Sequence, residues 1–120
     1  MSLRCLIVDD SPHFLEAARI LLEQEGVRVV GVASTGAEAA RQAADLRPDV
    51  TLIDIDLGAE SGFSVAEALA RSNSGAAGKL VLVSTHSEEE FADLIEASPA
   101  VGFVPKTQLS AQAIEQLLAR

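Results

Sequence analysis

The sequence predicts a doubly wound α/β fold, with one parallel sheet of five strands covered by helices on both faces. Short apolar runs alternate strictly with longer stretches of helical period, and this order implies right-handed βαβ units. The apolar runs are continuous rather than alternating, as in strands that are buried on both faces. The chain has 120 residues, of which 48% are hydrophobic and 22% charged. We therefore expect a single domain over residues 1–120 with a packed core.

The first half of the chain contains three of the predicted strands and two of the helices. The strands are Cys5–Val8, Val27–Val32 and Val50–Ile53. Ser11-Pro12 supplies an N-cap and a proline at the first helical position, and Gly26 ends that helix. After a turn at Ser34–Gly36, an alanine-rich helix is expected to run to about Asp45 and to end before Pro48.

The second half continues the same alternation. The two remaining strands are Leu80–Val83 and Ala100–Val104. A loop that contains Gly58 precedes a helix opened by Ser61-Gly62, and a turn of small residues, Ser72–Gly78, follows that helix. Ser87 is expected to cap an acidic fourth helix and Ser110 the last helix. The pattern thus predicts five strands and five helices.

Charge and composition exclude several classes of function. Nine Lys and Arg residues stand against eighteen Asp and Glu residues, which gives a formal net charge of −9. Nucleic acid attracts basic proteins, so direct nucleic-acid binding by this chain is not expected. The single cysteine excludes an intramolecular disulfide, and no apolar run approaches the length of a membrane helix. We expect a cytoplasmic protein without membrane contact.

Polar residues follow the predicted strands at the points where a parallel α/β sheet binds its ligands. These residues are Asp9, Asp10, Asp54, Asp56, Ser84, Thr85 and Lys106. In the flavodoxin-like strand order 2-1-3-4-5, the first and third strands are neighbours, so the carboxylates after them converge on one edge of the sheet. Any one of these residues alone would most simply cap a helix or a turn. Together they predict a site.

The residue types at this edge favour a cation and a phosphate. Crowded carboxylates repel one another unless a cation lies among them, and Mg²⁺ suits a site of one or two carboxylates. A lysine is a compact charge suited to a phosphoryl oxygen, and Lys106 is one of only two lysines, the other being Lys79. A carboxylate in such a pocket can also act as a nucleophile and form an aspartyl phosphate.

The order of these motifs resembles the receiver domain of two-component response regulators over nearly the whole chain. The residues that carry the resemblance are Val8-Asp9-Asp10, Pro48-Asp49-Val50, Ile53-Asp54, Val83-Ser84 and Gly102-Phe103-Val104-Pro105-Lys106. The last segment is most similar to receivers of LuxR/NarL-type transcriptional regulators. The resemblance implies a CheY-like switch that receives a phosphoryl group from a sensor histidine kinase and regulates transcription through a partner or a separate DNA-binding domain. It implies no turnover of an external substrate.

The resemblance also assigns roles to residues. Asp54 is the expected phospho-acceptor. Asp10 would bind Mg²⁺ directly, Asp9 mostly through water, and the backbone carbonyl of Asp56 would be a further ligand. Ser84 and Lys106 would contact the phosphoryl group.

The expected output of such a switch is a change at the face made by the fourth helix, fifth strand and fifth helix. Phe103 would turn inward as Ser84 moves toward the phosphoryl group. This change makes a homodimer on phosphorylation a possible outcome.

The chain departs from the family pattern at several positions. Gly58 stands where a proline is frequent, which favours a more flexible loop, and Thr107 replaces a proline often joined by a cis bond. Asp56 adds a carboxylate beside the site, and His86 borders it.

Three other interpretations are open from sequence alone. Asp54-Ile55-Asp56 resembles the nucleophile and acid pair of haloacid-dehalogenase-like phosphatases, although that motif usually lies on a first strand. A flavin carrier would need a phosphate-cradling loop after its first strand, where Asp9-Asp10 would repel phosphate. A pseudo-receiver would act as a binding module without phosphorylation.

Overall fold

The computed structural model describes residues 2–72 and 75–120, and these contain one parallel sheet of five strands. The strands are β1 (Arg4–Val8), β2 (Arg28–Ala33), β3 (Val50–Asp54), β6 (Lys79–Ser84) and β7 (Gly102–Pro105). Their order across the sheet is β2-β1-β3-β6-β7, and each neighbouring pair is parallel. By count this is the order 2-1-3-4-5, so the predicted topology is confirmed.

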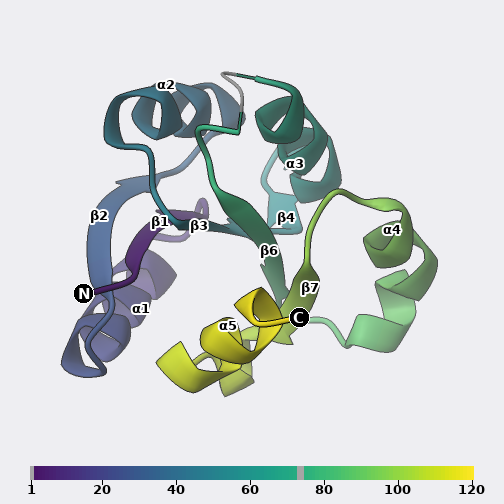
Figure 1. Cartoon of the computed structure of the whole chain (residues 1–120). Helices are drawn as coiled ribbons and strands as arrows, with labels where there is room; N and C mark the ends of the chain where they lie inside the picture. The colour runs from purple at the N-terminus through teal and green to yellow at the C-terminus, as the bar shows by residue number, and fades with distance from the viewer. Residues whose placement is uncertain (1, 73–74) are drawn as a thin grey trace.

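Five α-helices cover the two faces of this sheet (Figure 1). They are α1 (Pro12–Gln24), α2 (Gly36–Leu46), α3 (Gly62–Arg71), α4 (Ala92–Ala97) and α5 (Ala111–Leu118). Side chains of α1 and α5 share one buried cluster with β1, β3, β6 and β7. Side chains of α2, α3 and α4 form the other cluster on the opposite face. The alternation of side chains along each strand separates the two clusters, because successive residues point to opposite faces.

Side-chain caps begin four of the helices where the sequence places a hydroxyl. The cap residues are Ser11, Thr35, Ser61 and Ser110, each of which accepts a hydrogen bond from a backbone N–H in the first turn. Each such cap typically stabilises a helix by about 1 kcal/mol. Gly26 follows the end of α1 with φ of 92°, a left-handed conformation that favours glycine.

The predicted fourth helix is wrong in its first turn. Glu88–Phe91 forms a 3₁₀ helix, and α4 begins only at Ala92. In this described part of the chain Ser87 makes no side-chain cap. Phe91 leaves helical geometry at φ of −123°, where its ring packs against the rings of Phe63 and His86. Tertiary packing of one aromatic ring therefore overrides the local capping signal.

A small hairpin occupies the segment that was predicted to be a loop. β4 (Asp56–Leu57) pairs antiparallel with β5 (Glu60–Ser61), and Gly58 begins the two-residue turn with φ of 62°. Proline holds φ near −65° and could not adopt this conformation, so glycine here makes a defined turn of the type that suits hairpins.

Two smaller differences concern the second half of the chain. β7 begins at Gly102 rather than Ala100, because the Ala100 N–H donates to the Ser98 hydroxyl instead of to a strand. Part of the predicted turn 72–78 lies outside the described residues. A short 3₁₀ helix, Lys106–Gln108, follows β7, and the Lys106–Thr107 bond is trans. Among the helices of the described ranges, none has the length and apolar character needed to cross a bilayer.

Candidate functional site

The predicted site residues lie together at the carboxyl ends of adjacent strands. Asp9 and Asp10 directly follow β1, Asp54 is the last residue of β3, Ser84 ends β6 and Lys106 follows β7. These strands are neighbours in the order β1-β3-β6-β7, so residues far apart in the sequence share one edge of the sheet. The structure brings together the carboxylates of Asp9, Asp10 and Asp54 and the ammonium group of Lys106. Thr85 is exposed, and Asp56 faces solvent with 66% of its side chain exposed.

Three carboxylates form a tight cluster at this edge. Asp9, Asp10 and Asp54 each offer a carboxylate oxygen, and these atoms lie within 4.8 Å of one another. Asp9 and Asp54 are buried, whereas Asp10 is exposed. The Oδ1 atom of Asp9 accepts a hydrogen bond from the Ser11 N–H at 2.8 Å, so the start of α1 holds this carboxylate in place.

Lys106 is the cation that closes the cluster. Its Nζ lies 2.7 Å from Asp9 Oδ2 and 3.4 Å from Asp54 Oδ2, and only 14% of its side chain is exposed. Asp9 Oδ2 is itself buried, and among the described residues its partner is this ion pair rather than a well-directed hydrogen bond. One lysine therefore faces a cluster of three carboxylates, which leaves an excess of negative charge.

The environment of Asp54 favours its protonated form in the metal-free protein. Burial, together with the negative charge of Asp9, raises the pKa of Asp54 to about 6. Lys106 and the backbone N–H of Asp56 oppose this increase but do not cancel it. An excess of buried negative charge is what a bound cation would neutralise.

The raised pKa of Asp54 predicts a pH dependence of stability. Between pH 3.8 and about pH 6, the folded metal-free protein holds a proton on Asp54 that the unfolded chain has lost. This proton stabilises the folded state. Its contribution to the free energy of unfolding is complete below pH 3.8 and is lost as the pH rises through about 6. We expect Asp54→Asn to remove this decline and to raise the free energy of unfolding at pH 7 by about 2 kcal/mol. Urea unfolding in a chelator at several pH values measures both effects. Equal slopes for the two proteins would contradict the prediction.

Ser84 and Phe103, the two expected switch residues, are both buried. The Ser84 hydroxyl accepts a hydrogen bond from the His86 N–H at 3.0 Å. Phe103 is 7% exposed and belongs to the core cluster of α2, α3 and α4. Its ring is thus already turned inward.

An exposed histidine joins two acidic residues beside the site. His86 Nε2 lies 3.3 Å from Asp56 Oδ2, and His86 Nδ1 lies 3.2 Å from Glu90 Oε2. The sequence placed Asp56 and His86 at the border of the site but missed Glu90. His86 lies before the 3₁₀ helix Glu88–Phe91, so helical spacing does not explain the contact, which the tertiary structure alone reveals.

The Gly58 turn lies directly over the cluster. A Cβ atom at Gly58 would be 3.1 Å from Asp10 Oδ2, which is closer than most side-chain contacts. Glycine at this position thus provides both the positive φ of the turn and room for the Asp10 carboxylate.

The donor set fits a magnesium ion. Mg²⁺ is bound by oxygen ligands, typically one or two carboxylates with water or phosphate oxygens. Asp9, Asp10 and Asp54 provide carboxylate oxygens within 4.8 Å of one another, and the buried Asp9 Oδ2 has no well-directed hydrogen bond among the described residues. Asp10 is exposed, so the cluster is open to the solvent from which an ion and its waters would come.

These features define a doubly wound α/β domain with an acidic site, closed by a lysine, at the carboxyl ends of its strands. The family model of the response regulator receiver domain matches residues 5–119. The chain therefore belongs to the family of receiver domains of two-component response regulators, as its motifs predicted, and this family acts in phosphorylation-based signalling.

Individual relatives agree with this assignment. The chain is 38% identical over 118 residues to protein-glutamate methylesterase/protein-glutamine glutaminase 5 of Myxococcus xanthus, covering 96% of this chain and 33% of the relative. It is 30% identical to response regulator GacA of Pseudomonas viridiflava, covering 96% of this chain and 53% of the relative. A LuxR-family response regulator from Aurantimonas sp. matches with a TM-score of 0.84 and 27% identity, over 99% of this chain and 86% of that structure. The chain thus spans about a third to a half of these curated relatives.

Proposed function

We propose that this chain is a signalling switch that accepts a phosphoryl group on Asp54 from a sensor histidine kinase. One observation carries the proposal: the buried Asp54 carboxylate has an oxygen within 4.8 Å of those of Asp9 and Asp10, and its Oδ2 lies 3.4 Å from the ammonium group of Lys106. A nucleophilic oxygen thus lies beside a positive charge that can meet phosphoryl oxygens.

In the proposed reaction, a carboxylate oxygen of Asp54 attacks the phosphorus in line with the leaving group. The new oxygen–phosphorus bond forms as the bond to the donor breaks, and the donor departs with that electron pair. Lys106 would neutralise charge on the phosphoryl oxygens, and the Ser84 hydroxyl would donate a hydrogen bond to one of them. Mg²⁺ held by Asp9, Asp10, Asp54 and the Asp56 carbonyl would supply further charge neutralisation.

A small phosphodonor tests the proposal without the kinase. Incubation with acetyl phosphate and Mg²⁺ is expected to add one phosphoryl group to the chain, measured by intact mass. A chelator should prevent the addition. Labelling that persists in the chelator would contradict the metal requirement, and failure to label at all would favour a pseudo-receiver. We expect no catalytic turnover of an external phosphate ester, which would instead indicate a phosphatase.

The lifetime of the phosphorylated state should depend on Asp56 and His86. Their contact at 3.3 Å places two polar side chains at the border of the path that we propose for the attacking water. Asp56→Asn is expected to change the hydrolysis rate by about 2- to 20-fold, equivalent to roughly 0.4–1.8 kcal/mol. His86→Ala should slow hydrolysis by a smaller factor, because it removes the imidazole that would orient the water. Phosphate release from the labelled variants measures both rates, and unchanged rates would show that neither side chain meets the water.

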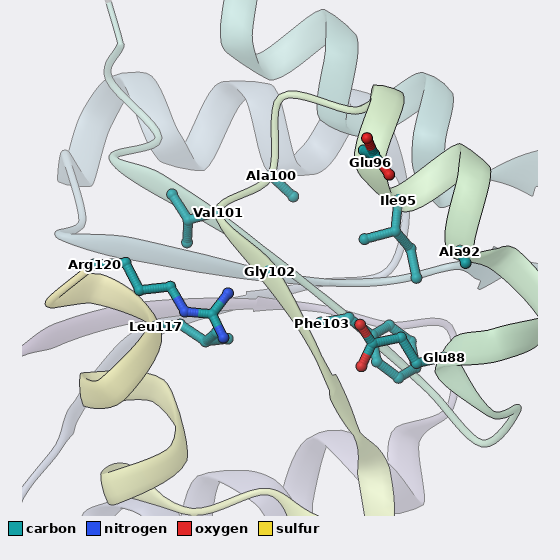
Figure 2. Close-up of a pocket in the computed structure, with 10 residues that line it drawn as sticks. All are labelled: Glu88, Ala92, Ile95, Glu96, Ala100, Val101, Gly102, Phe103, Leu117 and Arg120. Atoms are coloured by element: carbon teal, nitrogen blue, oxygen red, sulfur yellow. The ribbon is translucent and has the colours of Figure 1, made fainter.

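The proposed output is a change at the face formed by α4, β7 and α5. This face contains a pocket of about 340 Å³ (Figure 2). Ile95, Phe103 and Leu117 provide apolar lining, whereas Glu88 and Arg120 bring charges of opposite sign. Phe103, which lines this pocket, belongs to β7, and Pro105 of the same strand pairs with Ser84 of β6. A shift of Ser84 toward a phosphoryl group would thus reach the pocket through adjacent strands.

Self-association is the measurable consequence that we propose for this face. Beryllofluoride, which imitates the phosphoryl group, is expected to shift the protein toward a dimer in sedimentation experiments. The double variant Phe103→Ala and Ser84→Ala should abolish the shift. Glu88 and Arg120 bring opposite charges to this face, so we expect added salt to weaken the dimer. A shift that survives the double variant would contradict the switch mechanism while leaving phosphorylation intact.

The setting of this switch is inferred from its relatives. The similarity to the DNA-binding transcriptional activator EvgA of Escherichia coli supports a role in transcription through a partner or another domain. We place this role in the cytoplasm. The net charge of −9 supports the proposal that this chain does not bind nucleic acid itself.

A further inference from the structure

A closed ring of contacts joins the start of α1 to the lysine that follows β7. Asp9 Oδ1 accepts a hydrogen bond from the Ser11 N–H at 2.8 Å, and the Ser11 hydroxyl accepts one from the Phe14 N–H at 3.3 Å. The ring of Phe14 lies against Lys106, with Nζ 4.2 Å from the ring centroid. Lys106 Nζ then returns to Asp9 Oδ2 at 2.7 Å. The helix cap thus places an aromatic ring against the lysine of the site.

We propose that Phe14 is a positioning residue for Lys106, whose ring holds the ammonium group in place before a phosphoryl group arrives. The inference rests on the proposed function, in which Lys106 meets the phosphoryl oxygens. In the sequence, Phe14 is simply an apolar residue in the first turn of α1. Its contact with Lys106 arises from two segments 92 residues apart in the chain.

The chemistry of the ammonium group explains why a ring is needed there. Lysine has a flexible four-carbon stem and three donors, so one ion pair does not fix its direction. Nζ is closer to Asp9 than to Asp54, at 2.7 Å against 3.4 Å. The negative face of an aromatic ring attracts a cation, and the attraction is stronger where the cation is shielded from water, as Lys106 is. An aliphatic side chain would fill the same space without this attraction.

Rates of labelling by acetyl phosphate test the proposal. Phe14→Leu is expected to slow labelling of Asp54 by about 3- to 10-fold, the range expected for loss of a partly shielded cation–π contact. Phe14→Tyr retains the ring and should stay within about 2-fold of the parent protein. Phe63→Leu is the matched control, since Phe63 is also half-buried near the start of a helix but packs against Phe91 instead. It should label at the parent rate.

A spectroscopic measurement tests the contact itself. The ε-methylene protons of Lys106 should be shifted upfield by the ring current in the parent protein and in Phe14→Tyr, and should lose this shift in Phe14→Leu. Thermal unfolding of each variant shows that it is folded. An unshifted Lys106 signal in the parent protein would overturn the proposal. Labelling of Phe14→Leu at the parent rate would also overturn it, and so would labelling of Phe14→Tyr that is as slow as that of Phe14→Leu. Failure of the parent protein to label would overturn the proposed function alone, because the proton shift reports the contact without phosphorylation.

Discussion

Asp54→Asn should abolish labelling by acetyl phosphate, with a rate at least about 100-fold below that of the parent protein. The amide nearly preserves the shape of the side chain but lacks the anionic oxygen that attacks phosphorus. The variant should remain folded, because it removes negative charge from a cluster that already has an excess. Intact mass measured against time, in Mg²⁺, gives the rate.

Asp45→Asn is the matched control for this experiment. Asp45 is an exposed carboxylate on α2, outside the acidic cluster, and the same substitution there should leave labelling unchanged. Labelling of Asp54→Asn at the parent rate would show that another group accepts the phosphoryl group. Asp10 would then be the first alternative to test, since its carboxylate is exposed at the same site.

Gly62→Ala is expected to lower the free energy of unfolding by about 3 to 4 kcal/mol. Gly62 begins α3, and its N–H donates to the Ile55 carbonyl at 2.7 Å. A Cβ atom at this position would lie 2.1 Å from the backbone oxygen of Asp54 and 2.7 Å from the Cα of Ile55. Both are backbone atoms, so a change of side-chain rotamer cannot relieve the contact. The backbone beside the phospho-acceptor must shift, and we expect labelling to slow as well.

Gly26→Ala separates the effect of crowding from that of backbone conformation. Gly26 has φ of 92°, but a Cβ atom there would meet nothing within 4 Å. Its substitution should cost about 1 kcal/mol, which reflects the left-handed conformation alone. Urea unfolding of the two variants gives the comparison. A smaller loss of stability for Gly62→Ala than for Gly26→Ala would show that the contact at the start of α3 is relieved without cost.

The features that depend on neighbouring residues could be predicted from the sequence. The continuous apolar runs identified all five strands of the main sheet, and alternation with helices led to the strand order that the structure confirms. Ser11, Ser61 and Ser110 marked the helix starts, because a cap depends on a hydroxyl and the N–H two or three residues later. The acidic residues after β1 and β3 could be placed at one edge because parallel strands end together.

The features that depend on contacts between distant segments were decided only by the tertiary structure. The ring of Phe91 packs between α3 and His86 and replaces the predicted first turn of the fourth helix with a 3₁₀ helix. From the sequence, Phe14 is an apolar residue of α1, and only the structure shows that Lys106, which follows β7, lies against its ring. Local sequence determines which backbone conformation is favourable, but the position of a side chain relative to another element depends on how the layers pack. The sequence by itself therefore determined the strands, most helix starts and the candidate site residues, whereas packing decided which side chains surround and orient them.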